Sequence, residues 1–465
     1  MKVLHVLANS PPDVNGYAIR TQKILENHPN QVVGLTSPWY PDRDSMVEEY
    51  DLDGIKILRT IHPVRKTNTK FSHNLVKLFT PDPEKENKRK RKKRLETDSK
   101  KILPLRIFDF FYYAPIKLAR AIRHFFRLGW KVVEEKILIK YFTKRIIEVA
   151  KQENVDLIHA HTPYRVGLPA LKAARKLKLP FVYEMRGMWE ETAVANGRWK
   201  KNGPAYRRFQ KFETKVLKKA DAVVCISETL KTEAISRGVK EAKITVVTNA
   251  VEYDIAENNT KGETYKKTVK ELNKGKSTKV VGYIGSLREM EGVDLTAEAV
   301  SQLISQGHDV KFLALTSESG QAELQQYCDQ LGLGDNAVIT GPVPHKQVGP
   351  FYDLIDIFVV SRPDTAVTRI VTPLKPFEAM AMGKAVIASR LPALAEIIDD
   401  EKTGLLYQPE LVSSLCNAIS ICLNDDNYME RLCANAKDWV INNRTWDHVV
   451  KNYPIAYQIA IDSRG

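Results

Sequence analysis

Two runs of short apolar strands alternating with amphipathic helices, separated by a polar stretch, constrain the fold of this chain more than any other feature. In such an alternation each helix carries the chain back over a sheet, so that the next strand runs parallel to the last. The pattern predicts an α/β protein with two Rossmann-like domains, each built on a doubly wound parallel sheet. The carboxyl ends of the strands would face each other across a cleft, where ligands bind in such folds.

The first run predicts an N-terminal domain over residues 1–250. Four helices are predicted in this domain. The first begins near Tyr17, the second runs over Pro169 to Lys176, the third ends near Lys219, and the fourth begins after a capping Ser227. The predicted strands are Val3 to Ala8, Val32 to Leu35, Leu157 to Ala160, Phe181 to Glu184, Ala222 to Ile226 and Ile244 to Val247.

Residues 251–277 are polar, lack apolar periodicity and are predicted to be a linker. The second run predicts a C-terminal domain over residues 278–445, and residues 446–465 are predicted to form a helix that crosses back to the N-terminal domain. The predicted strands of the second run are Val280 to Ile284, Val310 to Leu315, Ala337 to Thr340, Ile357 to Val360 and Val386 to Ala388. Its predicted helices are Leu295 to Ser305, Gln321 to Leu331 and Lys375 to Met382, with a mostly helical tail from Leu411.

A basic insert interrupts the N-terminal domain at about residues 63–145. Residues 85–145 contain 20 Lys or Arg and six Asp or Glu, a local charge of +14 in a chain of formal net charge +15. Seven basic residues run from Lys88 to Arg94, and ten aromatic residues follow them before Arg145 ends the segment. Cations interspersed with aromatic residues are typical of segments that bind an anionic membrane surface, and we expect residues 85–145 to bind one. A solvated loop and helices packed on the domain are the alternatives.

The rest of the composition indicates an intracellular protein. The five cysteines form no C-x-x-C pair, which argues against a disulfide framework or a metal site. The N-terminus alternates like a buried strand rather than a signal peptide, and no run of about twenty apolar residues occurs. We expect a cytoplasmic protein, peripheral on the inner face of the plasma membrane. Nucleic acid is not an expected partner, because the aromatic residues of the insert lie in apolar clusters.

Polar residues lie after predicted strands of the N-terminal domain, at the ends that would face the cleft. Gly16 would let backbone N–H groups approach an anionic ligand, and Arg20 follows one helical turn later. His161 follows the strand Leu157 to Ala160, where a neutral imidazole could hydrogen-bond a sugar hydroxyl, and Arg186 follows the next strand. A turn glycine, a structural histidine and a surface loop are the alternatives at these positions.

The segment from Arg369 to Ser389 is the most informative in the chain. A loop that contains Thr372 and is broken by proline leads into a short helix at Lys375. Lys375 and free backbone N–H groups could face a phosphate there. Glu378, inside the helix, could accept hydrogen bonds from two ribose hydroxyls. The segment therefore predicts a nucleotide-binding site.

This segment resembles the nucleotide-binding signature of the retaining glycosyltransferases of family 4 (glycosyltransferase group 1), which have the GT-B fold. The His-x-His of His159 and His161 and the Gly-Ser-Leu loop at Gly285 resemble the same family. The resemblance covers the chain except the basic insert and the linker. It implies a nucleotide-sugar donor, expected to be a UDP-sugar, bound by the C-terminal domain without a metal cofactor. It also implies that His161 contacts the donor sugar near the reacting carbon.

Two features depart from the family pattern. The glutamate expected eight residues before Glu378 is Ile370, and the arginine and lysine expected in the Gly-rich loop are Ser286 and Glu291. Arg288, Arg369 and Lys375 are then the candidate cations for the donor diphosphate. The Pro-Leu-Lys-Pro-Phe-Glu run resembles a subgroup of polysaccharide-building transferases.

The resemblance implies a glycosyltransferase that acts, with retention of anomeric configuration, on a membrane-associated and lipid-linked acceptor in cell-surface polysaccharide or glycolipid biosynthesis. Two alternatives remain. A sugar-nucleotide 2-epimerase would share the fold but need no acceptor. A non-catalytic, membrane-bound partner of another transferase would explain the two departures.

Overall fold

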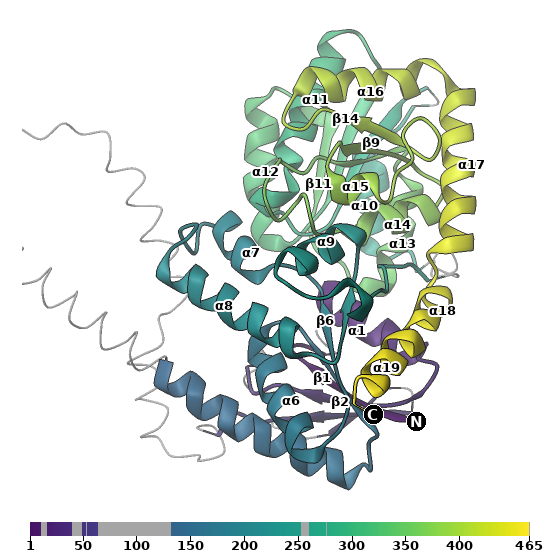
Figure 1. The fold of residues 1–465 in the computed structure, drawn as a ribbon. Helices are drawn as coiled ribbons and strands as arrows, with labels where there is room; N and C mark the ends of the chain where they lie inside the picture. The colour runs from purple at the N-terminus through teal and green to yellow at the C-terminus, as the bar shows by residue number, and fades with distance from the viewer. Residues whose placement is uncertain are drawn as a thin grey trace, which may run out of the picture.

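The computed structural model describes residues 1–10, 16–39, 49–52, 54–63, 132–252, 260–275 and 277–464. These residues form two α/β domains, one above the other in Figure 1, each built on a single sheet. The first 47 residues of the predicted membrane-binding segment, 85–131, lie outside the described residues. No helix in the described ranges combines the length and the hydropathy needed to cross a membrane.

The N-terminal sheet has eight strands in the order β3-β4-β2-β1-β5-β6-β7-β8, parallel except for the pair β3 and β4. The strand order reverses between β1 and β5, which makes their carboxyl ends the switch point where ligands bind in open α/β sheets. The strands are β1 (Lys2–Leu7), β2 (Gln31–Thr36), β3 (Glu49–Leu52), β4 (Ile55–Arg59), β5 (Leu157–His161), β6 (Phe181–Met185), β7 (Ala222–Cys225) and β8 (Ile244–Val246).

Different helices cover the two faces of this sheet. One face packs against α6 (Tyr164–Leu177), α8 (Pro204–Lys219) and the helix 132–152, which contributes Phe142 and Ile146 to the core. The other face packs against α1 (Gly16–Glu26) and the C-terminal helix α19 (Tyr453–Asp462). Among the described residues, this domain also contains α7 (Trp189–Ala195) and α9 (Glu228–Ser236).

The C-terminal sheet is parallel, in the order β11-β10-β9-β12-β13-β14, and its order reverses between β9 and β12. Its faces pack against separate apolar clusters. The strands are β9 (Lys279–Ile284), β10 (Val310–Leu315), β11 (Ala337–Thr340), β12 (Ile357–Val360), β13 (Ala385–Ser389) and β14 (Leu405–Tyr407). The helices are α11 (Val293–Ser305), α12 (Glu318–Gln330), α13 (Gly349–Asp353), α14 (Lys375–Ala381), α15 (Pro392–Ala395), α16 (Val412–Asn424) and α17 (Asp426–Asn443).

Two local predictions differ from the structure. The expected linker contains the helix α10 (Glu263–Leu272), whose Tyr265 ring lies 5.6 Å from that of Phe351 and whose Leu272 is buried. Tyr265, Thr268 and Leu272 stand at helical spacing, a weak periodicity among many polar residues. Helix α6 begins at Tyr164 rather than at Pro169, which lies inside the helix.

The chain crosses between the domains twice, at adjacent positions. The Val251 N–H donates to the carbonyl of Arg444 (2.8 Å), and the Trp446 N–H donates to the carbonyl of Val251 (3.2 Å). After this crossing α18 (Trp446–Val449) and α19 return to the N-terminal domain, where α19 lies against β6, β7 and β8 (Figure 1). The last helix of the chain is therefore part of the first domain.

Candidate active site

The lysine of the predicted nucleotide motif lies at the switch point of the C-terminal sheet. Lys375 is the first residue of α14, and its Nζ lies 2.6 Å from the Tyr283 hydroxyl and 2.8 Å from Glu291 Oε2. Its side chain passes over Gly285, which follows β9 with a φ of +147°. A Cβ at that position would lie 2.4 Å from Lys375 Cε. Glycine is therefore required at 285 for this placement of the lysine.

Glu291 joins Lys375 to a second cation, Arg362, which follows β12. The Arg362 guanidinium lies 3.1 Å from Glu291 Oε1, and both side chains are buried. Burial alone would raise the pKa of Glu291, but Arg362 and Lys375 outweigh it and lower that pKa to about 2. The result is a cluster of two cations and one carboxylate, with a net positive charge at the switch point. No motif in the sequence singles out Arg362, although its place directly after a buried strand is a usable signal.

The predicted ribose ligand lies one helical turn beyond the lysine. Glu378 Oε2 accepts a hydrogen bond of 2.7 Å from the hydroxyl of Tyr352, which is buried in the C-terminal core. This contact fixes the orientation of the carboxylate beside the cation cluster. Tyr352 comes from α13, about 26 residues earlier, and no sequence motif connects it to Glu378.

The other predicted residues of the C-terminal domain lie around this cluster in different settings. Ser286 and Arg288 are exposed in the loop after β9. Arg369 is also exposed and forms an ion pair with Asp364, with Nη2 2.6 Å from Oδ2. Thr372 is buried. The structure thus places Lys375 and Glu378 together and leaves Arg288 and Arg369 at the surface.

The N-terminal domain holds the loop 369–374 by its backbone. Asn249 Nδ2 donates to the carbonyl of Thr372 (2.9 Å), and the hydroxyls of Ser227 and Thr229 donate to the carbonyl of Ile370 (3.2 and 2.9 Å). Ser227 also accepts from the Leu230 N–H, which confirms the predicted helix cap. The Ile370 side chain packs against the core of the N-terminal domain, so this position makes an apolar contact between domains instead of presenting a carboxylate.

The two predicted arginines of the N-terminal domain meet at Glu184, which is completely buried. Arg186 Nε lies 2.7 Å and Arg20 Nε 3.2 Å from Glu184 Oε1. The Arg20 guanidinium also donates to the Val247 carbonyl and to Asn249 Oδ1 (2.7 and 3.0 Å). Arg20 therefore connects α1 to the end of the domain.

Arg186 lies against the first turns of α1, the helix that begins at the predicted residue Gly16. Its guanidinium lies 4.4 Å from the centre of the Tyr17 ring and donates to the hydroxyl of Thr21 (2.7 Å). A Cβ at Gly16 would lie 3.8 Å from Leu374 of the nucleotide motif, and one at Gly187 3.6 Å from Val371. Both glycines therefore stand where the two domains are in contact.

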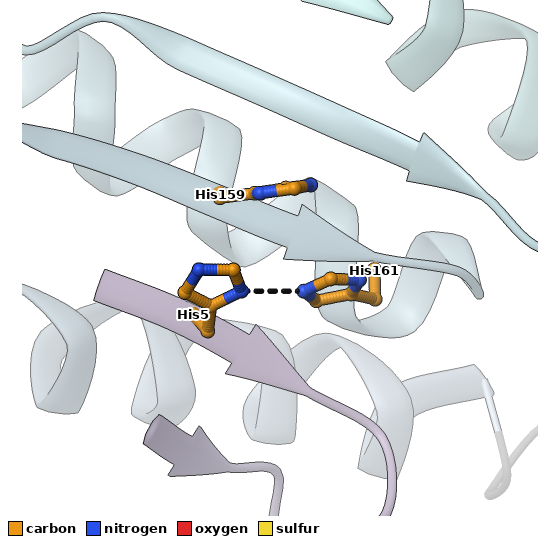
Figure 2. A group of neighbouring side chains, drawn as sticks. All are labelled: His5, His159 and His161. Atoms are coloured by element: carbon orange, nitrogen blue, oxygen red, sulfur yellow. Dashed lines mark hydrogen bonds between the residues drawn. The ribbon is translucent and has the colours of Figure 1, made fainter. Parts of the chain in front are cut away.

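His161 lies in a cluster of buried histidines (Figure 2). His161 Nε2 lies 3.0 Å from His5 Nδ1 on the neighbouring strand, and Nδ1 lies 3.5 Å from Glu184 Oε2. Burial lowers the pKa of His161 to about 4, so that its imidazole is neutral at neutral pH. A neutral ring agrees with the predicted chemistry, although the side chain is not exposed to solvent.

One group of histidines has the spacing of a metal site. The ligand atoms of His5, His159 and His161 lie within 4.8 Å of one another. A metal ion bound by imidazole lies in the ring plane, on the nitrogen lone pair. The rings of His159 and His161 are stacked, with centres 4.4 Å apart and planes 22° apart, and His5 and His161 point a nitrogen at each other (Figure 2). As placed, the three lone pairs do not converge, and the cluster fits a hydrogen-bonded network better.

Two family profiles match consecutive parts of the chain: "Glycosyltransferase Family 4" over residues 75–255 and "Glycosyl transferases group 1" over residues 265–439. Among curated proteins, the chain is 26% identical over 252 residues to an uncharacterized glycosyltransferase of Methanocaldococcus jannaschii, covering 52% of this chain and 61% of that one. It is 24% identical over 268 residues to alpha-monoglucosyldiacylglycerol synthase of Streptococcus pneumoniae, covering 57% and 59%. The chain thus spans about three fifths of the length of these relatives.

The fold has solved counterparts. The structure of HepE of Anabaena in complex with UDP superposes with a TM-score of 0.64 at 14% sequence identity, covering 98% of this chain and 100% of that one. The two parallel sheets and this likeness confirm the predicted GT-B architecture. The chain therefore has the GT-B fold, and its N-terminal region matches the family 4 model and its C-terminal domain the group 1 model of the glycosyltransferases.

Proposed function

We propose that this protein transfers a sugar from a nucleotide-sugar donor to a lipid-linked glycan acceptor at the inner face of the plasma membrane, with retention of anomeric configuration. The proposed donor is a UDP-sugar, and the proposed process is the assembly of cell-surface polysaccharide or glycolipid. The observation that carries the proposal is the cluster of Lys375, Arg362 and Glu291 at the switch point of the C-terminal sheet, one helical turn from Glu378.

The cluster suits the leaving group of such a reaction. As the glycosidic bond breaks, the nucleoside diphosphate gains negative charge, and fixed cations stabilise that charge most effectively where water is largely excluded. Lys375 is partly exposed and Arg362 is buried behind Glu291, so Lys375 is the group that would meet the diphosphate first. Arg288 and Arg369 are exposed nearby in sequence and are proposed as secondary contacts. Glu378 would accept the ribose hydroxyls.

His161 is proposed to contact the donor sugar near the reacting carbon. It ends β5 at the switch point of the N-terminal sheet, and its neutral imidazole can donate or accept a hydrogen bond. The imidazole is buried in the described structure, so this contact requires movement of the residues that cover it.

The proposed membrane contact rests on charge and on one described helix. The segment 132–152 follows the basic stretch and presents Val133, Lys136, Ile137, Lys140 and Lys144 as exposed side chains at helical spacing. Apolar side chains beside lysines on one helix face bind an anionic lipid surface. The relative from Streptococcus pneumoniae is named as a glycolipid synthase, which supports an acceptor in the membrane.

The transfer is tested by incubating the purified chain with UDP-, GDP-, ADP- and dTDP-sugars, with and without a membrane lipid extract. We expect release of one nucleoside diphosphate that depends on the extract, together with labelled lipid product. Lys375→Ala should reduce this release by about 100-fold or more. The control Lys384→Ala changes a half-buried lysine just beyond α14 and should leave the rate unchanged.

Other outcomes favour the alternatives. Diphosphate release with a free sugar product and no need for lipid would indicate an epimerase. No binding or turnover of any of these donors would indicate a non-catalytic partner of another transferase.

The membrane contact is tested by co-sedimentation with vesicles that contain phosphatidylserine or only phosphatidylcholine. Charge reversal of Lys136, Lys140 and Lys144 should weaken binding to the anionic vesicles. The matched control reverses Lys266, Lys267 and Lys270, which are exposed on α10 of the other domain. Equal loss in both variants would show that only net charge matters and would count against this helix as the contact.

A further inference from the structure

The face of the N-terminal sheet beneath α19 is apolar except at its centre. Val3, Leu157, Val182 and Val224 pack there against the C-terminal helix. His5, His159 and Glu184 project from the same face, since side chains alternate along a strand. Burying these polar groups is costly unless each has a partner. The helix that covers them therefore has to supply hydrogen bonds as well as apolar surface.

Helix α19 supplies two tyrosine hydroxyls to this centre. The Tyr453 hydroxyl donates to Glu184 Oε2 at 2.7 Å. The Tyr457 hydroxyl lies 3.0 Å from His159 Nδ1 and 2.9 Å from His28 Nε2. Both tyrosines are buried. The last helix of the chain thus completes the polar centre of the first domain.

Tyr453 stands at one end of a continuous chain of polar contacts that reaches the other domain. Glu184 accepts a hydrogen bond from the Tyr453 hydroxyl on Oε2 and one from Arg20 on Oε1. Arg20 also donates to Asn249 Oδ1. Asn249 then donates to the carbonyl of Thr372, three residues before Lys375. All four side chains in this path are buried, where hydrogen bonds are stronger and more directional than in water.

We propose that Tyr453 is a positioning residue for the proposed transfer, because it fixes Glu184 and, through Arg20 and Asn249, the loop 369–374 that leads to Lys375. The proposal rests on the proposed function for its catalytic meaning. The contact path itself does not depend on that function. Tyr453 is fully buried, and its proposed action is on the placement of the loop between the domains.

The test compares Tyr453→Phe with Tyr164→Phe. Tyr164 is a matched control, because it is also buried and its hydroxyl also donates to a glutamate, Glu135, at 2.8 Å, but on the opposite face of the sheet. Amide hydrogen exchange of residues 369–382 is the first measurement. We expect exchange to become at least about fivefold faster in Tyr453→Phe and to stay unchanged in Tyr164→Phe.

Asn249→Ala provides a second variant, at the other end of the path. The second readout is kcat. Tyr453→Phe and Asn249→Ala should each lower kcat by about tenfold. The double variant should be no slower than the slower single variant, because residues that act through one path are not additive. Asn249→Ala combined with Tyr164→Phe should show independent effects.

The outcomes separate the two claims. Unchanged exchange of the loop in Tyr453→Phe overturns the positioning role, whatever the transfer rate. Additive losses of kcat in Tyr453→Phe and Asn249→Ala overturn it as well. Faster loop exchange in Tyr453→Phe, together with a wild-type protein that transfers no sugar, would support the contact path and refute the proposed function.

Discussion

The two domains contain clusters with the same arrangement of charges in different environments. Each cluster places one buried glutamate between two cations: Glu184 with Arg20 and Arg186 in the N-terminal domain, and Glu291 with Arg362 and Lys375 in the C-terminal domain. The arginines beside Glu184 are 3% and 4% exposed, whereas Lys375 is 19% exposed. The closed cluster holds protein segments together, and the more open one leaves a cation that a ligand can reach.

The comparison predicts its largest effect for loss of the central carboxylate. Glu184→Gln leaves two buried arginines without a counter-charge and should lower the free energy of unfolding by about 3–5 kcal/mol. Glu291→Gln should cost less, about 2–3 kcal/mol, because only Arg362 is left as a buried cation without a counter-charge while Lys375 can turn toward water. Urea unfolding of both variants measures the difference. An equal or larger loss in Glu291→Gln would show that the two clusters are equally closed.

The second effect concerns the open cluster and activity. Lys375→Ala should lower the transfer rate by about 100- to 1,000-fold while changing the unfolding free energy little. Arg20→Ala, in the closed cluster, should instead lower the unfolding free energy together with the rate. Steady-state kinetics and thermal unfolding of the same preparations separate the two patterns. Strong destabilisation by Lys375→Ala would contradict a ligand-binding role for the open cluster.

The third expected difference between the clusters is the pH range in which each domain loses stability. Burial lowers the pKa of His161 to about 4, so the unfolded chain takes up protons below the ordinary histidine pKa of about 6.5 while the folded domain does not. The stability of the N-terminal domain should then fall as pH falls from about 6.5 toward 4, by about 2 kcal/mol at pH 5 for this one histidine.

The C-terminal cluster should respond in a lower pH range. The pKa of Glu291 is lowered to about 2, so its contribution is present above the ordinary glutamate pKa and is lost between about 4.5 and 2. Hydrogen exchange gives the free energy of unfolding of each domain at pH 7 and at pH 5. This free energy should be lower at pH 5 for the N-terminal domain alone. Parallel weakening of both domains would contradict the assignment.

The smallest effect is expected at the surface. Arg369 is 56% exposed and pairs with Asp364, a contact that contributes about 1 kcal/mol or less to stability. Arg369→Ala should therefore leave the unfolding temperature nearly unchanged and reduce transfer by only a few-fold. If Arg369→Ala lowered the transfer rate as much as Lys375→Ala, the main contact with the diphosphate would lie in the loop before α14 and not in the open cluster.

The sequence was sufficient for features that depend on local chemistry. Short apolar runs between helices predict strands such as β10 and β11 to the residue, and a serine before a helix predicts the Ser227 cap. The candidates Lys375 and Glu378 were recognised because one short motif contains both. Their expected roles remain predictions, since the structure shows their placement only.

The remaining features depend on contacts between distant segments, which leave no local pattern. Tyr453 meets Glu184 across 269 residues, and Arg362 meets Glu291 across 71. The place of Arg20 one turn after a glycine predicts a ligand residue, whereas its contacts with Glu184 and Asn249, in the interior of the protein, could not be predicted from the sequence. Burial and partners of this kind become visible only when the sheets are assembled.

The most direct test of the central claim compares the affinities of UDP and uridine by calorimetry, because their ratio isolates the contribution of the diphosphate. We predict that the wild type binds UDP far more tightly than uridine. Lys375→Ala should reduce this ratio by about 10- to 100-fold, the size of a charge-assisted hydrogen bond, and Lys384→Ala should preserve it. An unchanged ratio in Lys375→Ala would contradict the assignment of the diphosphate site to the open cluster.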